Sequence, residues 1–107
     1  MPALLESTQR ALDEGSVHPM IIAAKFHGFF EYLHPFRDGN GRLGRLMTNF
    51  ILLKKGLPML IIPVGKRTEY ITALKMIRKE ATDEYLIRFF VETAISELKL
   101  EIKRITN

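Results

Sequence analysis

The fold of this chain is decided by residues 19–53, which read PMIIAAKFHGFFEYLHPFRDGNGRLGRLMTNFILL. At both ends of this stretch apolar residues recur at intervals of three and four, which is the spacing of one face of an α-helix. The polar segment 34–41 between them contains two glycines and a proline, which interrupt helical structure. The pattern predicts one helix from about Pro19 to Leu33 and a second that begins near Gly41 and is stopped by Gly56-Leu57-Pro58.

Both helices are expected to contribute an apolar face to the core. In the first helix the rhythm runs through Ile22, Phe26, Phe29 and Phe30, while Lys25 must point outward. In the second helix the apolar stripe consists of Leu43, Leu46, Met47, Phe50 and Leu53.

The flanking segments are also helical in pattern. A helix is expected from Pro2 to about Gly15, because proline is tolerated in a first turn and glycine suits the turn after a helix. Residues 59–64 form a continuous apolar run between prolines, which fits a short strand or a buried extended connector. Two further helices are expected over residues 67–81 and 83–105, the last with an apolar stripe of Ile87, Phe90, Val91, Ala94, Leu98 and Ile102. The predicted fold class is therefore all-α, a helical bundle with at most a token strand.

Composition places the chain among ordinary globular proteins. Of its 107 residues 47% are hydrophobic and 26% charged, so we expect a single domain over residues 1–107. There is no cysteine, which excludes disulfide scaffolds and cysteine nucleophiles and fits a reducing compartment, the cytoplasm. No apolar run reaches the roughly 20 residues that span a bilayer, so no membrane association is expected. The net charge of +4 favours anionic partners, although a solvated basic surface is the commoner explanation.

The loop between the first two helices has the features of an anion site. It leads into a helix N-terminus, where unpaired backbone N–H groups and a partial positive charge attract anions. Gly39 and Gly41 allow backbone amides to approach a phosphate closely. Arg42, Arg45 and Asn49 are spaced to share one helix face, and two guanidinium groups beside an anion site suit a di- or triphosphate.

Two further residues of the loop supply reactive groups. Asp38 offers a hard carboxylate oxygen, which suits Mg²⁺ held jointly by protein and phosphates. His34 carries the side chain that titrates near neutral pH and can act as a base. Together these groups are the parts that phosphoryl or nucleotidyl transfer needs.

Two competing interpretations fit the sequence less well. Gly39 to Gly44 matches the dinucleotide pattern GxGxxG, but no hydrophobic strand precedes it and no acidic residue follows about 20 positions later. His18 and His27 have no carboxylate neighbours and are expected to be structural, and their spacing to His34 fits no known three-histidine metal site.

Residues 34–45 match the Fic-domain signature HPFxxGNGRxxR at every fixed position, so the chain resembles the Fic family. The likeness extends to His18-Pro19, Ala23-Ala24 and His27 before the motif. After it, Gly56-Leu57-Pro58 and the pattern Arg67, Tyr70, Ala73-Leu74 are also similar. The resemblance implies an all-α Fic core over residues 1–107, with the active-site loop at a helix N-terminus.

The resemblance further implies a protein adenylyltransferase that moves AMP from ATP, with Mg²⁺, to a Ser, Thr or Tyr hydroxyl of a target protein. Related enzymes transfer UMP or phosphocholine instead. The resemblance implies that His34 is the base and that Asp38 binds Mg²⁺. Asn40, with the backbone of Gly39 and Gly41, would contact the α-phosphate, and Arg45 would contact the terminal phosphates with support from Arg42. Phe36 would anchor the loop. Tyr70 is expected either near the adenine or in the core, with equal weight.

The chain departs from the family pattern in two places. No pair of strands precedes His18, so the β-hairpin flap of Fic proteins is expected to be absent and the chain to be part of a longer protein. Residues 93–97 match five positions of the family's inhibitory pattern, but Leu98 replaces the following Gly or Asn, which makes a chance match of Glu97 the favoured explanation.

The alternative function is a non-catalytic module that binds nucleotide or nucleic acid, although a nucleic-acid partner is not expected for this segment. Homo-oligomerisation stays open.

Overall fold

The computed structural model describes residues 2–33 and 40–106. These residues form five α-helices and one short 3-10 helix: α1 (Pro2–Glu14), α2 (Pro19–Leu33), α3 (Asn40–Lys54), η1 (Val64–Lys66), α4 (Arg67–Glu80) and α5 (Glu84–Thr106). Over these ranges no strand occurs, and no helix is long and apolar enough to cross a membrane. The all-α prediction is confirmed, and the predicted helix ends agree to about one residue.

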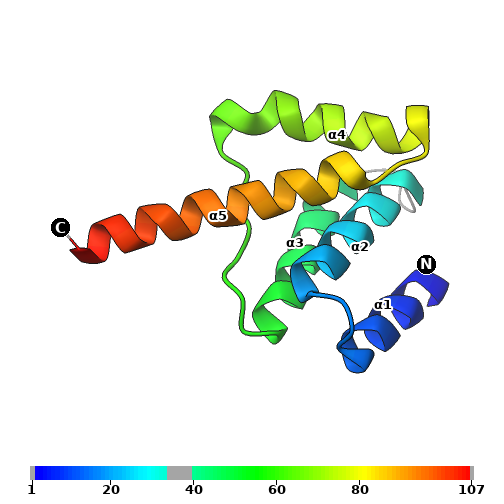
Figure 1. The fold of residues 1–107 in the computed structure, drawn as a ribbon. Coiled ribbons are helices and arrows are strands. Elements are labelled where there is room, and N and C mark those ends of the chain that lie inside the picture. The colour runs from blue at the N-terminus through cyan, green and yellow to red at the C-terminus, as the bar shows by residue number, and fades with distance from the viewer. Residues whose placement is uncertain (1, 34–39, 107) are drawn as a thin grey trace.

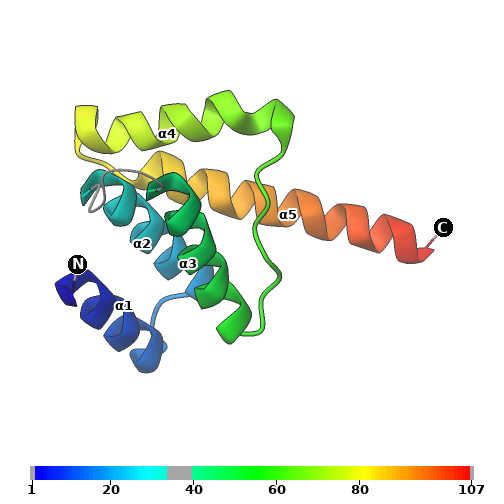
Figure 2. The same cartoon turned by 180° about the vertical axis from the view of Figure 1, so that it is seen from behind.

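Helix α2 is the centre of the bundle. It contacts α1, α3, α4 and α5. Figures 1 and 2 show α1 and α3 on either side of α2, both running antiparallel to it, while α4 and α5 pass across one end as an antiparallel pair. The C-terminal half of α5 extends beyond the other helices in both views.

The central position of α2 explains why nearly all of its sides are apolar. Phe26 and Phe30 are fully buried, as predicted, and their rings stack at a centroid distance of 5.9 Å. Phe29, however, is 51% exposed, so its assignment to the core was wrong. It lies four residues after the exposed Lys25, and residues at that spacing share the one side of α2 that faces solvent.

The packing face of α3 also differs from the predicted stripe. Leu46 and Phe50 are 67% and 66% exposed, and Leu53 is exposed as well. The buried residues are instead Gly44, Thr48, Ile51 and Leu52. Helix α3 approaches α2 so closely that a methyl group on Gly44 would lie 3.0 Å from Cδ1 of Phe30. In the first part of α3 the small residues Gly44 and Thr48 therefore face α2, and Leu46 and Phe50 lie at the surface.

Helix α5 follows its predicted stripe only as far as the bundle reaches. Phe90 is buried, and Ile87, Val91 and Ala94 are half-buried. Leu98 and Ile102 are exposed, because this part of the helix projects past its neighbours.

The end of α3 and the connector after it are fixed by local hydrogen bonds. Gly56 adopts a positive φ of 75°, and Leu57 N–H donates to the Leu52 carbonyl at 2.9 Å, as in a Schellman motif. The connector then runs extended past α3, where the Asn49 amide accepts from Leu60 N–H at 2.7 Å and donates to Leu60 O at 3.2 Å. The extended-connector alternative is confirmed, although within it only Leu60 is buried.

Candidate functional site

The predicted site falls partly within the described structure. His34, Phe36, Asp38 and Gly39 lie outside the described residues. Asn40 is the first residue of α3, and Gly41, Arg42 and Arg45 follow in its first turns. The N-terminus of α3 is therefore where the motif was predicted to place it, and its first backbone N–H groups have no acceptor within the helix, which favours an anion.

The Arg45 side chain folds back toward the start of α3. A methyl group on Gly41 would lie 3.1 Å from Nη1 of Arg45, so the guanidinium passes over a position that has no side chain. The Glu31 carboxylate of α2 is close by, since its Oε1 lies 2.8 Å from the Cβ position of Gly44 and 3.9 Å from that of Gly41. The Glu31 carboxylate of α2 and the Arg45 guanidinium of α3 therefore both lie beside the first turn of α3.

A hollow of about 420 Å³ lies on the side of α3 that carries Arg45 and Asn49. Its lining combines Arg45 of α3 and Arg67 and Tyr70 of α4 with apolar residues of the connector. The structure therefore brings Arg45 and Tyr70 together, as predicted residues of one site. Arg42 is exposed and lies outside the residues that line the hollow.

Arg67 also lines the hollow, although in the sequence it stands out only as part of the family likeness. It lies three residues before Tyr70 on α4, and this spacing places the two on one helix face. The spacing was the available signal, but it has meaning only once α4 is known to line the same hollow as Arg45 of α3. The hollow therefore holds two guanidinium groups in a partly apolar wall, which suits an anionic ligand that also carries an apolar group.

Tyr70 is largely buried, at 6% exposure. Its ring packs against His27 and Phe89, and its hydroxyl hydrogen-bonds with Nε2 of His27. Burial, helped by the Glu31 charge, raises the pKa of Tyr70 to about 12, against the opposing effects of Arg45 and Arg67. The hydroxyl is therefore protonated at neutral pH, and Tyr70 is both a core residue and the inner edge of the hollow.

The two other described histidines have structural partners, as expected. His18 precedes α2, and its Nδ1 accepts the N–H of Met20 at 3.1 Å, which caps the helix. His27 is buried, and burial lowers its pKa to about 4, with the Gly44 carbonyl acting in the opposite direction and the Arg45 charge in the same one. Among residues 2–33 and 40–106, no three His, Cys, Asp or Glu side chains gather as a metal site.

Helix α4 also holds the end of α2 that leads into the motif loop. The Arg78 guanidinium donates to the Tyr32 carbonyl and lies over the Tyr32 ring, 4.7 Å from its centroid. A cation at this position satisfies one of the free carbonyls of the last turn and interacts favourably with the helix dipole. Arg78 thereby fixes the backbone two residues before His34.

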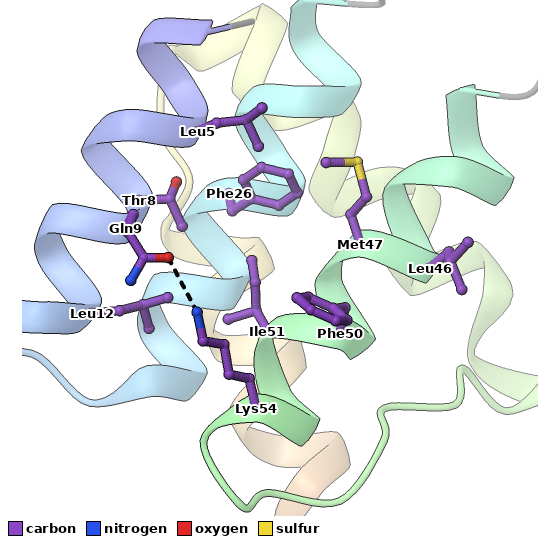
Figure 3. A pocket seen from close by; sticks show the side chains of 10 residues that line it. All are labelled: Leu5, Thr8, Gln9, Leu12, Phe26, Leu46, Met47, Phe50, Ile51 and Lys54. Carbon is purple, nitrogen blue, oxygen red and sulfur yellow. Dashed lines mark hydrogen bonds between the residues drawn. The ribbon is translucent and has the colours of Figure 1, made fainter.

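A second hollow, of about 480 Å³, has a different character (Figure 3). It lies between α1 and α3 above Phe26 and is lined mainly by apolar side chains, including the exposed Leu46 and Phe50. The cation of its lining, Lys54, donates to the Gln9 side chain at 3.4 Å. The residues that line this second hollow include no arginine, whereas the hollow beside Arg45 has two.

Glu97 lies in neither hollow. It lines a depression of about 110 Å³ with residues such as Lys66 and Thr93.

Comparison with known proteins agrees with this geometry. The model of the Fic/DOC family matches residues 1–52, which include the whole motif. A Fic domain containing signaling protein from Bacteroides thetaiotaomicron superposes with a TM-score of 0.87 at 29% identity, covering 96% of this chain and 43% of that one. The chain belongs to the Fic/DOC family. The Fic-1 structure from C. elegans has a TM-score of 0.78 at 28% identity and covers 94% of this Fic chain and 31% of its own.

Curated Fic relatives match over a shorter stretch. Proteins named protein adenylyltransferase Fic from Drosophila grimshawi and Drosophila mojavensis are each 38% identical over 85 residues, which is 79% of this chain. The chain spans 17% of the length of each of these relatives. The hollow is lined by Arg45, the last residue of the Fic motif. The chain that contains it is much shorter than its named relatives.

Proposed function

We propose that this Fic domain transfers AMP from ATP to a hydroxyl group of a target protein. The observation that carries the proposal is the placement of Arg45, whose guanidinium folds back over Gly41 and lines a hollow that Arg67 and Tyr70 share. A helix N-terminus followed by paired guanidinium groups suits a nucleoside triphosphate. The activity named in the curated relatives supports the same function.

In this proposal the nucleotide lies along the start of α3. Arg45 holds the terminal phosphates, Arg42 adds positive charge, and Asn40 with the backbone of Gly39 and Gly41 holds the α-phosphate side. The base of the nucleotide occupies the hollow, with Tyr70 at its inner edge. The domain in this proposal is a Fic core over residues 1–107.

The proposed reaction is an in-line displacement. The oxygen of the target Ser, Thr or Tyr hydroxyl forms a bond with the α-phosphorus, and the bond from that phosphorus to pyrophosphate breaks. His34 takes the hydroxyl proton, and Arg45 offsets charge on the departing pyrophosphate.

Mg²⁺ is proposed to be held by Asp38 together with phosphate oxygens. A cation that keeps several phosphate and water ligands needs few protein carboxylates, so a single aspartate suits it. When bound, Mg²⁺ neutralises phosphate charge. The lack of cysteine in the sequence supports the proposed cytoplasmic location, where targets and ATP are both at hand.

The test of the proposal is transfer of label from α-³²P-ATP to protein. We expect the unmodified chain, incubated with Mg²⁺ and a cell extract of candidate targets, to incorporate label, and His34→Ala to reduce incorporation at least about 100-fold. ATP binding should survive this change, because His34 acts on the hydroxyl and not on the phosphates.

His18→Asn serves as the matched histidine control, since asparagine also caps a helix. Equal labelling by the unmodified chain and His34→Ala would refute His34 as the base. Binding of ATP without any labelling would favour the non-catalytic module.

A further inference from the structure

Three buried polar side chains connect the helices beneath the start of α3. Thr48 of α3 is bonded to the Gly44 carbonyl at 2.7 Å, and its Oγ1 lies 3.0 Å from Nδ1 of His27 in α2. The other ring nitrogen of His27 is bonded to the hydroxyl of Tyr70 in α4. Tyr70 and Arg45 line the same hollow, where the Arg45 guanidinium opposes the rise in the pKa of the Tyr70 hydroxyl. We call this chain of three hydrogen bonds, which ends beside Arg45, the α3 relay.

The two ends of the α3 relay fix the position of every proton in it. The Gly44 carbonyl can only accept, so the Thr48 hydroxyl donates its one proton there. Thr48 Oγ1 must then accept from His27, which places the imidazole proton on Nδ1. Nε2 of the neutral ring is left as an acceptor, so the Tyr70 hydroxyl donates to it.

The orientation of the Tyr70 hydroxyl at the end of the α3 relay follows in the same way. Because its proton points at His27, the lone pairs of its oxygen are left for the neighbouring Arg45 guanidinium, which can only donate. The charged groups around this oxygen are Glu31, Arg45 and Arg67. A proton on Nε2 of His27 would remove the acceptor for the Tyr70 hydroxyl. The donors and acceptors along the α3 relay would then no longer match.

The α3 relay joins the surroundings of two consecutive residues of α3. It begins at Tyr70 of α4, which shares a hollow with Arg45, passes through His27 of α2 and Thr48 of α3, and ends at the Gly44 carbonyl. Arginine is a long side chain that loses much rotamer freedom when it is held in one place. The buried hydrogen bonds of the relay hold the Tyr70 hydroxyl in one orientation, so that a fixed acceptor lies in the hollow that Arg45 lines.

We propose that His27 and Thr48 are positioning residues that hold Arg45 in place for the terminal phosphates of the nucleotide. They touch no substrate themselves and act through the Tyr70 hydroxyl. This inference rests on the proposed function, in which Arg45 binds those phosphates.

The first experiment measures ATP affinity by calorimetry, with Mg²⁺, on the full chain and on variants confirmed to be folded by circular dichroism. Thr48→Val keeps the shape of the side chain but removes the relay hydroxyl, and Tyr70→Phe keeps the ring but removes its oxygen. We expect each to weaken ATP binding about tenfold, as for a lost hydrogen bond to a charged group. Thr48→Ser, which retains the hydroxyl, should restore affinity.

Thr72→Val and Tyr85→Phe are the matched controls, because both residues lie in a separate depression between α4 and α5. Their ATP affinity should equal that of the unmodified chain. If Thr48→Val and Tyr70→Phe bind ATP as tightly as the controls, the positioning role is refuted while the proposed function stands. Absence of ATP binding by the unmodified chain would instead refute the proposed function and the positioning role with it.

The second experiment does not depend on ATP. In ¹⁵N-labelled protein the two imidazole nitrogens of His27 give distinct chemical shifts for a protonated and an unprotonated site. We expect Nδ1 to be protonated and Nε2 to be unprotonated at pH 7. The opposite tautomer, or a doubly protonated ring at that pH, would overturn the α3 relay.

Discussion

His27 occupies a place where a helical core would ordinarily have a hydrophobic side chain. It is 1% exposed and lies among Phe90, Tyr70 and Thr48. Both ring nitrogens have partners, so the neutral imidazole is buried without an unsatisfied polar atom. A charged imidazole at the same place would lose its hydration with no carboxylate partner among these neighbours, which explains why burial lowers the pKa of His27 to about 4.

We predict that this histidine makes the fold sensitive to mild acid. The pKa of His27 is about 4 in the folded chain and returns to its ordinary value of 6.5 on unfolding, so the unfolded chain binds more protons between these values. The contribution is therefore fully present above pH 6.5 and is lost as the pH falls toward 4, for a total on the order of 3 kcal/mol. Urea unfolding at pH 7 and at pH 4.5 measures the difference.

Replacement of His27 isolates this effect from that of the carboxylates. His27→Asn should lower stability at pH 7 and flatten the dependence on pH. An unchanged pH dependence in His27→Asn would show that His27 does not titrate with unfolding.

At the scale of elements, α3 serves two purposes that place opposite demands on its surface. Its first turn carries backbone N–H groups that have no acceptor within the helix, and Arg45 lines the hollow, while its remaining length must pack on α2. Gly44 and Thr48 on the packing side bring the two helices close together, and Asn49 on the other side holds the connector at Leu60. Asn49 was expected to share a face with Arg45, and both do line the hollow, but its amide is bonded to backbone.

We predict that Asn49→Ala releases the connector. The variant loses two hydrogen bonds to Leu60, which together contribute about 1–3 kcal/mol to the free energy of unfolding. Hydrogen exchange should show the Leu60 amide losing its protection, because Asn49 Oδ1 is its acceptor.

Asn49→Asp is the matched comparison, since it keeps an acceptor for Leu60 N–H and loses only the donor. It should preserve most of the protection of that amide. Equal protection of Leu60 in the unmodified chain and in Asn49→Ala would contradict the assigned role.

At the scale of the whole molecule, burial is concentrated around α2 and decreases toward the two ends of the chain. The fully buried aromatic rings belong to α2 and to the first half of α5. From residue 95 to residue 106 every side chain of α5 is exposed. Figure 1 shows the reason, since this half of the helix passes beyond α2 and α4.

We predict that removal of residues 99–107 changes the free energy of unfolding by less than about 1 kcal/mol, because exposed positions contribute little packing. Phe90→Ala, in the buried half of the same helix, should cost about 3–5 kcal/mol. Thermal unfolding of both variants provides the comparison. A loss on truncation as large as that of Phe90→Ala would mean that the projecting half of α5 supports the bundle.

The sequence by itself determined the helices, their ends and the family motif. Helical periodicity, glycines at Gly15 and Gly56, and prolines near helix starts are local features, so they act through neighbours along the chain. The motif from His34 to Arg45 likewise is contiguous, and its position at the start of α3 followed from the residues around it.

Only the tertiary structure decided which faces of those helices are used. Periodicity counts apolar residues, but the approach of α3 to α2 is limited by side-chain size, which turned Gly44 and Thr48 inward and Leu46 and Phe50 outward. The hollow and the α3 relay join residues from Arg45 to His27 and Tyr70 on three helices. Hydrogen bonds between groups so far apart in the chain depend on how the helices cross, and spacing within any one helix carries no information about that.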